Sequence, residues 1–523
     1  MASTFHIENF GCRAARADGE AVAALLRTSG AAESAPADAD VVIVNTCSVT
    51  AEADREARAY IRRANRQNPQ ARIIATGCYA QRAPQELASL PGVAAVLGNS
   101  HKALAPELAL HLALNKVSGH GFSQADNLSL HEPRTLAPAR ASQSQLVSLR
   151  DLLGSGSPPL VLADDAFAHS FLEEAPITPG AQTRPNLKIQ EGCSNRCSFC
   201  VIPQTRGNSR SLPPSSVLSH VRSFAESGGK ELVLSGINLG RWGRDLDRLT
   251  SEPRSLAALV SAIFNQTNLP RLRLSSIEPM DWDAGLIAIV REFAGSHLVS
   301  PTTGSWAGRL ARHAHLPLQS GSDSVLRRMH RRYRPWHYAE KILELIHAAG
   351  PALTIGADVM AGFPGETDRE FQDTYDFIRS LPFGYLHLFP FSPRPGTRAD
   401  QLHRENPVPA PAVDHRIAAL RILAAEKVRS HRLQFIGAEF NTITLNTPPS
   451  LAAVGRTSGI TDNFLPVEIE TSLPANRLVP IRITAISADD TLLGSPVIPN
   501  ISQIDSPFPI SPEFLRPDLE NAF

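Results

Sequence analysis

The sequence is poor in several residue types, and each scarcity excludes a class of protein. Its 523 residues include six cysteines and four tryptophans, and its 51 basic side chains equal its 51 acidic ones. A chain without net charge has no global field that attracts phosphate. No apolar run approaches the roughly 18 residues of a membrane span, and the start MASTFHIENF lacks the basic and apolar regions of a signal peptide. We therefore expect a soluble, cytoplasmic protein without a membrane partner.

The six cysteines fall into two groups of three. Cys193, Cys197 and Cys200 stand together, whereas Cys12, Cys47 and Cys78 are spread through the first part of the chain. In a reducing compartment, such sets are better explained as metal ligands than as disulfides.

The compact group, GCSNRCSFC, brings three thiolates to one centre. Structural zinc normally takes four ligands, and a cubane iron-sulfur cluster usually takes four cysteines, so three leave one iron open. A zinc knuckle that borrows a histidine is the alternative, but no histidine lies between His169 and His220. The spacing therefore favours an iron-sulfur cluster with one open iron.

Each dispersed cysteine directly follows a short β-rich run. The runs are 4–10, 40–46 and 71–77, and the segments 16–29 and 51–66 between them have helical composition. This alternation predicts a doubly wound parallel sheet, in which ligands bind beyond the carboxyl ends of the strands. We expect Cys12, Cys47 and Cys78 to converge at that edge; three unrelated buried cysteines are the alternative.

The length predicts three or four domains, and shifts in composition give their boundaries. We expect an α/β domain at 1–116, a low-complexity linker at 117–183, a second α/β domain at 184–436, a small domain at 437–499 and a tail at 500–523. Within the linker, the apolar stretch LVLADDAFAHSFLEE could form a docked helix.

The second α/β domain holds six strand patterns, namely LKIQ, ELVLSG, RLRLSS, HLPLQ, LTIGADV and YLHLFPF. Helix-like segments alternate with them, and one of these runs from 323 to 349. Six βα units without a clear seventh predict an open, partial (β/α)6 barrel. Chemistry on such barrels gathers at the carboxyl ends of the strands, and Cys193 follows the first strand.

The 193–200 motif and the loops after the later strands resemble the radical S-adenosylmethionine (SAM) superfamily, in which SAM chelates the open iron through its amine and carboxylate. The resemblance implies that five further residues form the SAM site. These are Phe199, Gly236, Ser276, Glu278 and Gly362.

The segment 437–499 contains short β-rich runs divided by turns, which predict a small five-stranded barrel. Its stretch GRTSGITDNFLPVEIE resembles the RNA-binding TRAM domain. The domain order, together with NTCSVT, GCYAQ, GCSNRCSFCVIP, HLPLQSGSD and TSGITDN, resembles the methylthiotransferase family, and most of all its branch acting on threonylcarbamoyladenosine in tRNA.

That resemblance implies a transferase that adds a methylthio group to adenine C2 beside the anticodon. It implies two [4Fe-4S] clusters, SAM, a tRNA substrate and an electron donor such as flavodoxin or ferredoxin. The cluster on Cys193, Cys197 and Cys200 would cleave SAM to a 5′-deoxyadenosyl radical. The cluster on Cys12, Cys47 and Cys78 would carry the sulfur that a second SAM methylates. The stretches CRAARAD, after the first cysteine, and SPTTGSWAGRLARHA, at 300–314, depart from the family pattern.

Local charge predicts an RNA site in the barrel domain. Residues 309–334 hold seven arginines and one acid, with Tyr333 and Trp336 adjacent, which suits phosphate contacts and stacking on bases. We expect four arginines to bind RNA along a helix, away from the cluster; a solvated basic helix face is the alternative. The four are Arg327, Arg328, Arg331 and Arg332.

Other functions stay open. Related branches methylthiolate isopentenyladenosine in tRNA or an aspartate of a ribosomal protein. A function of another class, a non-catalytic iron-sulfur protein that binds RNA or transfers electrons, is opposed by the SAM-like loops. Production of deoxyadenosine on reduction would discriminate it.

Overall fold

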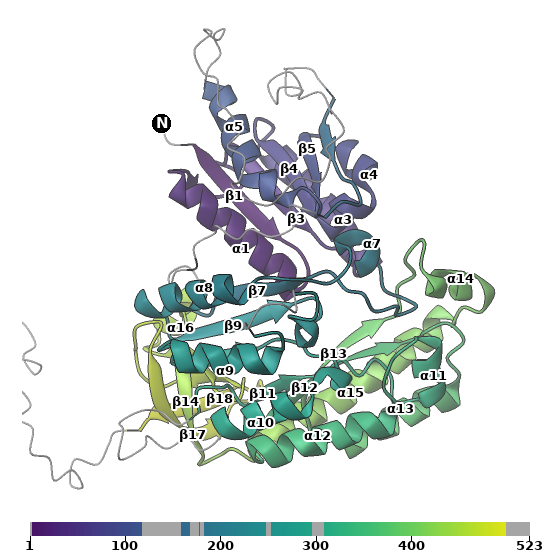
Figure 1. Ribbon diagram of the computed structural model, residues 1–523, viewed down its shortest axis with the longest axis vertical. Coiled ribbons are helices and arrows are strands. Elements are labelled where there is room, and N and C mark those ends of the chain that lie inside the picture. Colours follow the sequence, from purple (N-terminus) through teal and green to yellow (C-terminus); the bar gives the residue numbers. More distant parts are fainter. Residues whose placement is uncertain are drawn as a thin grey trace, which may run out of the picture.

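The computed structural model describes residues 3–117, 158–167, 177, 183–246, 253–294 and 308–497. Figure 1 shows an N-terminal α/β unit packed on one side of a central α/β unit, with a C-terminal barrel on another side. Among the described helices, none combines the length and the apolar character that a bilayer span needs.

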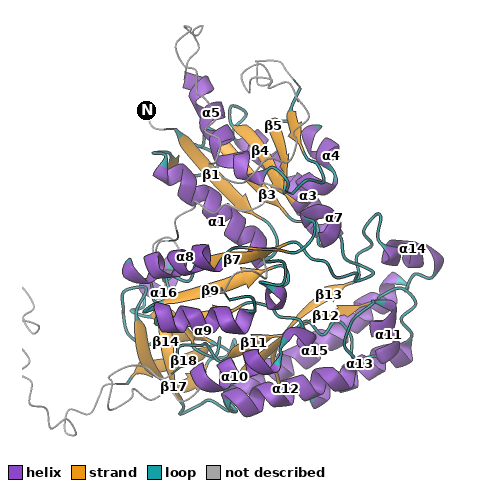
Figure 2. Cartoon of the chain, viewed as in Figure 1, coloured by secondary structure: helices purple, strands orange, loops and turns teal. Residues whose placement is uncertain are grey.

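The N-terminal unit is a six-stranded sheet in the order β2-β1-β3-β4-β5-β6, with every pairing parallel. Its central strand β3 is buried throughout, which explains its unbroken apolar sequence. Val41 and Ile43 of β3 pack under α1 and α5, whereas Val42 and Val44 pack under α2. Helices therefore cover both faces (Figure 2), and the prediction of a doubly wound sheet is confirmed. The strands are β1 Thr4–Asn9, β2 Ala32–Glu33, β3 Val41–Thr46, β4 Arg72–Gly77, β5 Val93–Gly98 and β6 Leu160–Leu162; the helices are α1 Arg13–Thr28, α2 Ala51–Gln67, α3 Cys78–Arg82, α4 Pro84–Ala88, η1 Lys102–Leu104 and α5 Ala105–Val117.

The edge strand β6 comes from the segment predicted to be a linker. It pairs in parallel with β5, from Ala95 opposite Leu160 to Leu97 opposite Leu162. The helix expected over LVLADDAFAHSFLEE is therefore wrong at its start, where three apolar residues complete the sheet. The rest of that stretch, beyond residue 167, lies outside the described residues.

The described part of the central unit contains six parallel strands and one short antiparallel edge strand, β8. Five of the six coincide with the predicted patterns, whereas the fourth spans His313–His315 and shares only its last residue with HLPLQ at 315–319. The strands form two sheets, β10-β9-β7-β8 and β11-β12-β13, joined by a bridge between Leu272 and Leu310. The partial barrel is thus confirmed. The strands are β7 Asn186–Glu191, β8 Arg210–Ser211, β9 Glu231–Gly236, β10 Arg271–Leu274, β11 His313–His315, β12 Thr354–Ala361 and β13 Phe383–Pro390; the helices are α7 Ile202–Arg206, α8 Pro214–Glu226, η2 Leu239–Arg241, α9 Leu256–Gln266, η3 Pro279–Asp281, α10 Ala284–Phe293, α11 Asp323–Arg328, α12 Pro335–Ala349, α13 Asp368–Ser380, α14 Arg398–Glu405 and α15 Ala410–Leu433.

The interior of this barrel is polar. Alternate residues of each strand, such as Ile189 and Leu272, belong to the apolar core under the outer helices. Because side chains alternate across a strand, their neighbours face the interior, and these are mostly polar. A closed barrel of this type is filled by branched apolar side chains, so the interior of this barrel departs from that pattern. The inward residues include Lys188, Gln190, Glu231, Ser235, Arg271, Arg273, His313, His315, Asp358, Tyr385 and His387.

The helix expected over 323–349 is two helices, which corrects that prediction. The helix α11 ends at Arg328, His330 has a left-handed φ of 56°, and α12 begins with Pro335 as its first residue. Proline has no N–H for an intrahelical bond, so it starts a helix more readily than it continues one. The arginines 327–332 therefore do not share one helix face.

The C-terminal unit is a closed five-stranded barrel in the order β14-β15-β16-β18-β17, as predicted. Phe440, Val467, Ile481 and Leu492 fill its core. Its strands are β14 Glu439–Thr444, β15 Thr457–Thr461, β16 Pro466–Ile469, β17 Leu478–Ile486 and β18 Leu492–Pro496, and a short helix, α16, spans Pro449–Ala452.

The turn between β15 and β16 packs against the amino-terminal ends of the central strands. Phe464, with a φ of 70°, lies 4.4 Å from the ring of His313 and 5.7 Å from the ring of Tyr385, centroid to centroid. Arg273 stacks over the same ring and donates to the Thr461 carbonyl oxygen at 3.2 Å. The C-terminal barrel thus covers one end of the central barrel.

Candidate active site

The loop carrying Cys193, Cys197 and Cys200 leaves the carboxyl end of β7. Gly192 makes the turn with a φ of 69°, and a Cβ there would lie 2.1 Å from the Asn208 carbonyl oxygen, so only glycine fits. The middle of the loop is held at Ser198, whose N–H donates to the Met329 carbonyl at 3.1 Å and whose hydroxyl donates to the Arg328 carbonyl at 2.9 Å. The loop is therefore fixed against the segment that follows α11.

Two thiols of this loop are held in the protonated form when no metal is bound. Burial, followed by the neighbouring Cys197 and Cys193, raises the pKa of Cys200 to about 12, and burial also raises the pKa of Cys193. Asn238 Nδ2 lies 3.6 Å from Cys193 Sγ. Protonated thiols must lose their protons when they bind metal, so binding of a metal cluster here releases protons.

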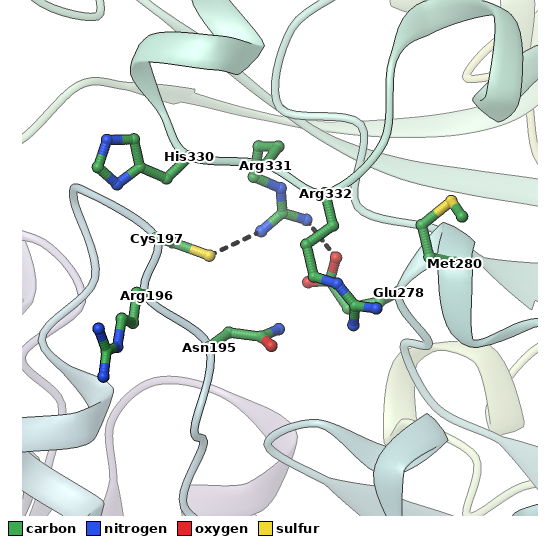
Figure 3. A pocket seen from close by; sticks show the side chains of 8 residues that line it. All are labelled: Asn195, Arg196, Cys197, Glu278, Met280, His330, Arg331 and Arg332. Carbon is green, nitrogen blue, oxygen red and sulfur yellow. Dashed lines mark hydrogen bonds and ion pairs between the residues drawn. The ribbon is translucent and has the colours of Figure 1, made fainter.

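A cavity of about 40 Å³ opens beside Cys197 (Figure 3). Arg331 lies between that cysteine and Glu278: its Nη1 is 3.3 Å from Cys197 Sγ and its Nη2 is 2.5 Å from Glu278 Oε2. Although burial lowers it, the Glu278 carboxylate holds the pKa of Arg331 well above its ordinary value. The cavity thus contains a charged pair in contact with a ligand thiol. Its lining comprises Asn195, Arg196, Cys197, Glu278, Met280, His330, Arg331 and Arg332.

The residues expected to hold SAM lie at this edge of the barrel, and they differ in whether they line the cavity. Glu278 is in the cavity, whereas Phe199 packs on the central core. Gly236 ends β9 against Gln190, whose Oε1 accepts from the Asn238 N–H at 2.6 Å. Two others follow strands at this edge: Ser276 comes after β10, and Gly362 comes after β12, where its N–H donates to Glu366 Oε2 at 2.8 Å. Their role toward SAM stays a prediction.

The N-terminal cysteines meet at the carboxyl edge of the first sheet, as their spacing predicted. A Cβ on Gly11 would lie 2.5 Å from Cys47 Sγ, so the residue before Cys12 abuts the second cysteine. Burial raises the pKa of Cys47 to about 12, and the next contributors are the thiols of Cys12 and Cys78. The three cysteines are therefore neighbours in the structure, and their joint role as cluster ligands stays a prediction.

Two side chains donate to Cys78. Arg206 Nε lies 3.1 Å from Cys78 Sγ, and Asn99 Nδ2 lies 3.4 Å from it. Asn99 Nδ2 also donates to the Thr205 carbonyl at 2.9 Å. Because Thr205 and Arg206 belong to α7 of the central unit, the N-terminal site is completed by another unit of the protein.

The helix α7 links the two triads directly. It starts two residues after Cys200 and ends at Arg206, so it spans roughly 8 Å at 1.5 Å per residue. A second contact joins the same two edges, because Arg394 of the central unit donates to Asp54 Oδ2 of α2 at 2.6 Å. The carboxyl edges of the two sheets therefore face each other.

Three-thiol donor sets fit iron-sulfur clusters, and unpaired polar atoms are found beside both. Within the described residues, Arg206 Nη2 and Asn99 Oδ1, near Cys78, and Asn238 Oδ1, near Cys193, are buried without a hydrogen-bond partner. Buried polar atoms normally find partners. Arg206 Nη2 is a donor that a cluster sulfide could accept from, whereas the two amide oxygens are acceptors and could meet only a donor, such as the amine of a ligand that chelates the open iron.

The expected RNA patch is largely structural, and its description needs correction. Arg331 is buried in the candidate active site, so the prediction that it lies away from the cluster and contacts RNA is wrong. Arg328 is engaged by Glu370, with contacts of 2.8 and 2.9 Å. Arg327 and Arg332 remain exposed, with 63% and 52% of their side-chain surfaces accessible. A role for these two in RNA binding stays a prediction.

Sequence reasoning missed Arg206, Asn99 and Asn238, and misplaced Arg331. The first three depend on contacts between segments far apart in the chain, for which no motif gives a signal. The sequence did contain a signal for the position of Arg331. Pro335 marks a helix start, which places residues 329–334 in a turn beside the cysteine loop.

Comparisons with known proteins agree with this geometry. Residues 4–98 match the family described as "Uncharacterized protein family UPF0004", and residues 187–378 match the radical SAM superfamily. The chain is 30% identical over 467 residues to the threonylcarbamoyladenosine tRNA methylthiotransferase MtaB of Bacillus subtilis, covering 89% of this chain and 90% of that one. It is 31% identical over 421 residues to the tRNA-2-methylthio-N(6)-dimethylallyladenosine synthase of Novosphingobium aromaticivorans, covering 80% and 81%. The methyltransferase TsrM of Kitasatospora setae has a similar chain trace, with 14% identity, 75% coverage of both chains and a TM-score of 0.44.

The partial barrel and the three-cysteine loop, together with the superfamily match, define a radical SAM enzyme, which uses a [4Fe-4S] cluster and SAM. The match of residues 4–98 and the relatives that align over most of their length identify the family within this class. The chain belongs to the methylthiotransferase family of radical SAM enzymes.

Proposed function

We propose that this protein adds a methylthio group to C2 of N6-threonylcarbamoyladenosine next to the anticodon of tRNA. The carrying observation is that two three-thiol sites lie on facing sheet edges and are bridged by α7, with Cys200 before it and Arg206 at its end. A transfer of sulfur to a carbon that must first be activated requires two such sites within reach of one substrate. The Bacillus subtilis relative carries this activity in its name.

In this proposal, Cys193, Cys197 and Cys200 hold one [4Fe-4S] cluster, and Cys12, Cys47 and Cys78 hold a second. With SAM bound and an electron supplied by a flavodoxin or ferredoxin in the cytoplasm, the first cluster supplies a carbon-radical reagent strong enough to activate a C–H bond. The chain's own residues orient and shield. Arg331 fixes Cys197 and Glu278 relative to each other, and Asn238 supports Cys193.

The polar barrel interior supports the threonylcarbamoyl substrate over the isopentenyl one. Asp358 contacts His315 Nε2 at 3.1 Å and His387 Nδ1 at 3.2 Å. Although burial raises it, these histidines hold the pKa of Asp358 below its ordinary range, so its carboxylate is charged. His315 Nδ1 also contacts the Tyr385 hydroxyl at 2.9 Å. A threonylcarbamoyl group offers a hydroxyl and amides that can join this hydrogen-bonded group of side chains, whereas an isopentenyl group offers no hydrogen-bonding atoms.

Nucleoside mass spectrometry of tRNA tests the proposal. In cells that lack the protein, methylthio-threonylcarbamoyladenosine should disappear and its unmethylthiolated precursor should accumulate, and the wild-type gene should restore it. A Cys12→Ala variant is the matched control, because it keeps the barrel intact. Loss of methylthio-isopentenyladenosine instead would assign the other tRNA branch, and unchanged tRNA with an altered ribosomal-protein aspartate would reject a tRNA substrate.

A further inference from the structure

Five charged side chains are buried together between the N-terminal and central units. Lys102 Nζ lies 2.9 Å from Asp18 and 2.7 Å from Glu191, and Lys188 contacts the same two carboxylates. Arg206 Nη1 lies 2.7 Å from Glu191 and 3.3 Å from Asp18. None of the five side chains is more than 6% exposed. This group is called the interface charge cluster below.

The interface charge cluster carries one more positive than negative charge at pH 7. Burial lowers the pKa of Lys102 to about 8, which leaves it protonated. Although burial raises it, Arg206 and the two lysines hold the pKa of Glu191 well below its ordinary value. Three cations thus face two carboxylates. A buried charge is costly unless it is paired, and Arg206 also contacts a group outside this cluster that is negative when it binds metal, the thiol of Cys78.

The direction of that contact follows from the shape of the guanidinium. In arginine, Nε and Nη2 point their hydrogens from one edge of a planar fork, and Nη1 points away from that edge. Nη1 of Arg206 holds the carboxylates, and Nε lies 3.1 Å from Cys78 Sγ. Nη2, on the Nε edge, is buried without a partner among the described residues. The donor without a partner therefore lies on the side of the N-terminal triad.

We propose that Arg206, a residue of the central unit, is the positioning residue of the cluster held by the N-terminal triad. The inference rests on the proposed function, which supplies that second cluster. Three thiolates outweigh the two positive charges of an oxidised [4Fe-4S] core by one, so the cluster that they hold is an anion that a buried guanidinium stabilises. Arg206 balances that charge through Nε on Cys78 and Nη2 on the cluster sulfur. It also makes retention of this cluster depend on contact between the two units.

Reduction of a cluster adds negative charge, so a nearby cation favours it. Removing Arg206 should therefore shift the reduction potential of the N-terminal cluster to a more negative value. Replacement by lysine keeps the charge but loses the two-donor edge, so its shift should be smaller. The direction and the order of the two shifts distinguish a positioning role from a packing role.

The experiment uses the full chain with Cys193, Cys197 and Cys200 changed to Ala, so that one cluster contributes the signal. Arg206→Met and Arg206→Lys are introduced into this background, reconstituted anaerobically and titrated by potentiometry with EPR detection, with iron measured per chain. The control is Arg271→Met, which removes another arginine that is 1% exposed but is held by Glu231, away from the thiols. Circular dichroism checks folding of each variant.

The expected result is a negative shift for Arg206→Met, a smaller one for Arg206→Lys and none for Arg271→Met, with faster loss of iron from the Met variant. Equal potentials and equal iron retention in all four proteins would overturn the inference and leave the second cluster intact. No iron in the background protein would overturn both this inference and the second cluster. If Arg206→Met does not fold, the comparison of Arg206→Lys with the background decides.

Discussion

The two cysteine triads offer the same three ligands, but one is a local sequence motif and the other is assembled from segments far apart in the chain. The triad at 193–200 lies on one loop, and its geometry is local. The triad of Cys12, Cys47 and Cys78 is assembled from three strand ends, and its last cysteine is contacted by α7 of the central unit. Each triad has one buried arginine on one thiol. Arg331 is neutralised by a single carboxylate, Glu278, whereas Arg206 belongs to a group with excess positive charge.

This difference separates a site that exchanges ligands from one that retains its contents. Beside Cys197 there is a cavity, and Glu278 has 22% of its side-chain surface exposed. Beside Cys78, Arg206 and Glu191 are fully buried. A cofactor that is consumed and replaced suits the first environment, and a group that stays bound suits the second. The predictions below test this contrast between the two triads.

The largest effect is expected from removing the loop triad. Changing Cys193, Cys197 and Cys200 to Ala should halve the iron of reconstituted protein and abolish SAM cleavage, because we propose that each triad holds one cluster. Iron analysis and deoxyadenosine quantification measure the two effects. Unchanged iron, or zinc in place of iron, would contradict the assignment.

Removing the N-terminal triad should separate the two roles. With Cys12, Cys47 and Cys78 changed to Ala, cleavage of SAM should persist, since the loop triad lies in another unit, but no sulfur should enter tRNA. Deoxyadenosine assays and nucleoside mass spectrometry on the same preparation test this. Retained methylthiolation would show that the N-terminal triad does not carry the sulfur.

A smaller effect should follow from Arg331→Met. The change removes the donor to Cys197 and leaves Glu278 without its partner. Loss of a residue that supports a metal ligand typically costs about 10–100-fold in affinity or activity, and we expect that range for SAM cleavage. Arg327→Met, whose side chain is 63% exposed and lies outside the cavity lining, is the matched control and should retain full cleavage. Equal rates for both variants would refute a role for Arg331.

The pH dependence of the cluster-free protein should reveal the buried thiols. The pKa of Cys47 and Cys200 is raised to about 12, against about 8.5 in an unfolded chain. A raised pKa favours the folded state below the unfolded value, so this stability is present below pH 8.5 and is lost as pH rises towards 12. Urea unfolding at pH 7, 9 and 10.5 measures it.

The matched control for that titration is the Cys47→Ala, Cys200→Ala double variant. It should lose less stability than the parent between pH 8.5 and 10.5. Comparison of the two proteins also cancels Lys102, whose lowered pKa acts in the opposite direction. Parallel curves would mean that the thiols titrate normally.

The smallest effect concerns RNA. Changing the exposed Arg327 and Arg332 to Gln removes up to two phosphate contacts, each worth roughly 0.9 (duplex) or 0.7 (single strand) in the slope of log affinity against log salt. Affinity for tRNA should fall modestly and its salt slope should decrease by up to about two, and the single Arg327→Gln variant, whose side chain lies outside the cavity lining, should keep SAM cleavage. Filter binding at several salt concentrations measures both. An unchanged slope would make these side chains ordinary surface residues.

The sequence predicted those parts of the fold and site that depend on local pattern. Strands before each cysteine and the five-stranded C-terminal barrel follow from alternating and β-rich runs, and the cysteine triads follow from spacing. The sequence did not predict β6, whose three residues gain strand structure only by pairing with β5. Nor did it predict Arg206 at Cys78, because the residues are 128 positions apart and belong to separate units. A contact between charged groups that are far apart in the chain produces no periodic pattern in a single sequence.

Phe464, a residue of the C-terminal unit, covers one end of the polar barrel interior of the central unit. Its ring lies against His313 and Tyr385 at the end of the barrel remote from the cysteines, with the guanidinium groups of Arg13, Arg184 and Arg273 over it. The C-terminal barrel is therefore a separate unit that also covers this end of the central barrel. A chain cut before residue 437 would have an interior open to water at both ends, and a radical enzyme with such an interior would lose the shelter that a reactive carbon centre needs.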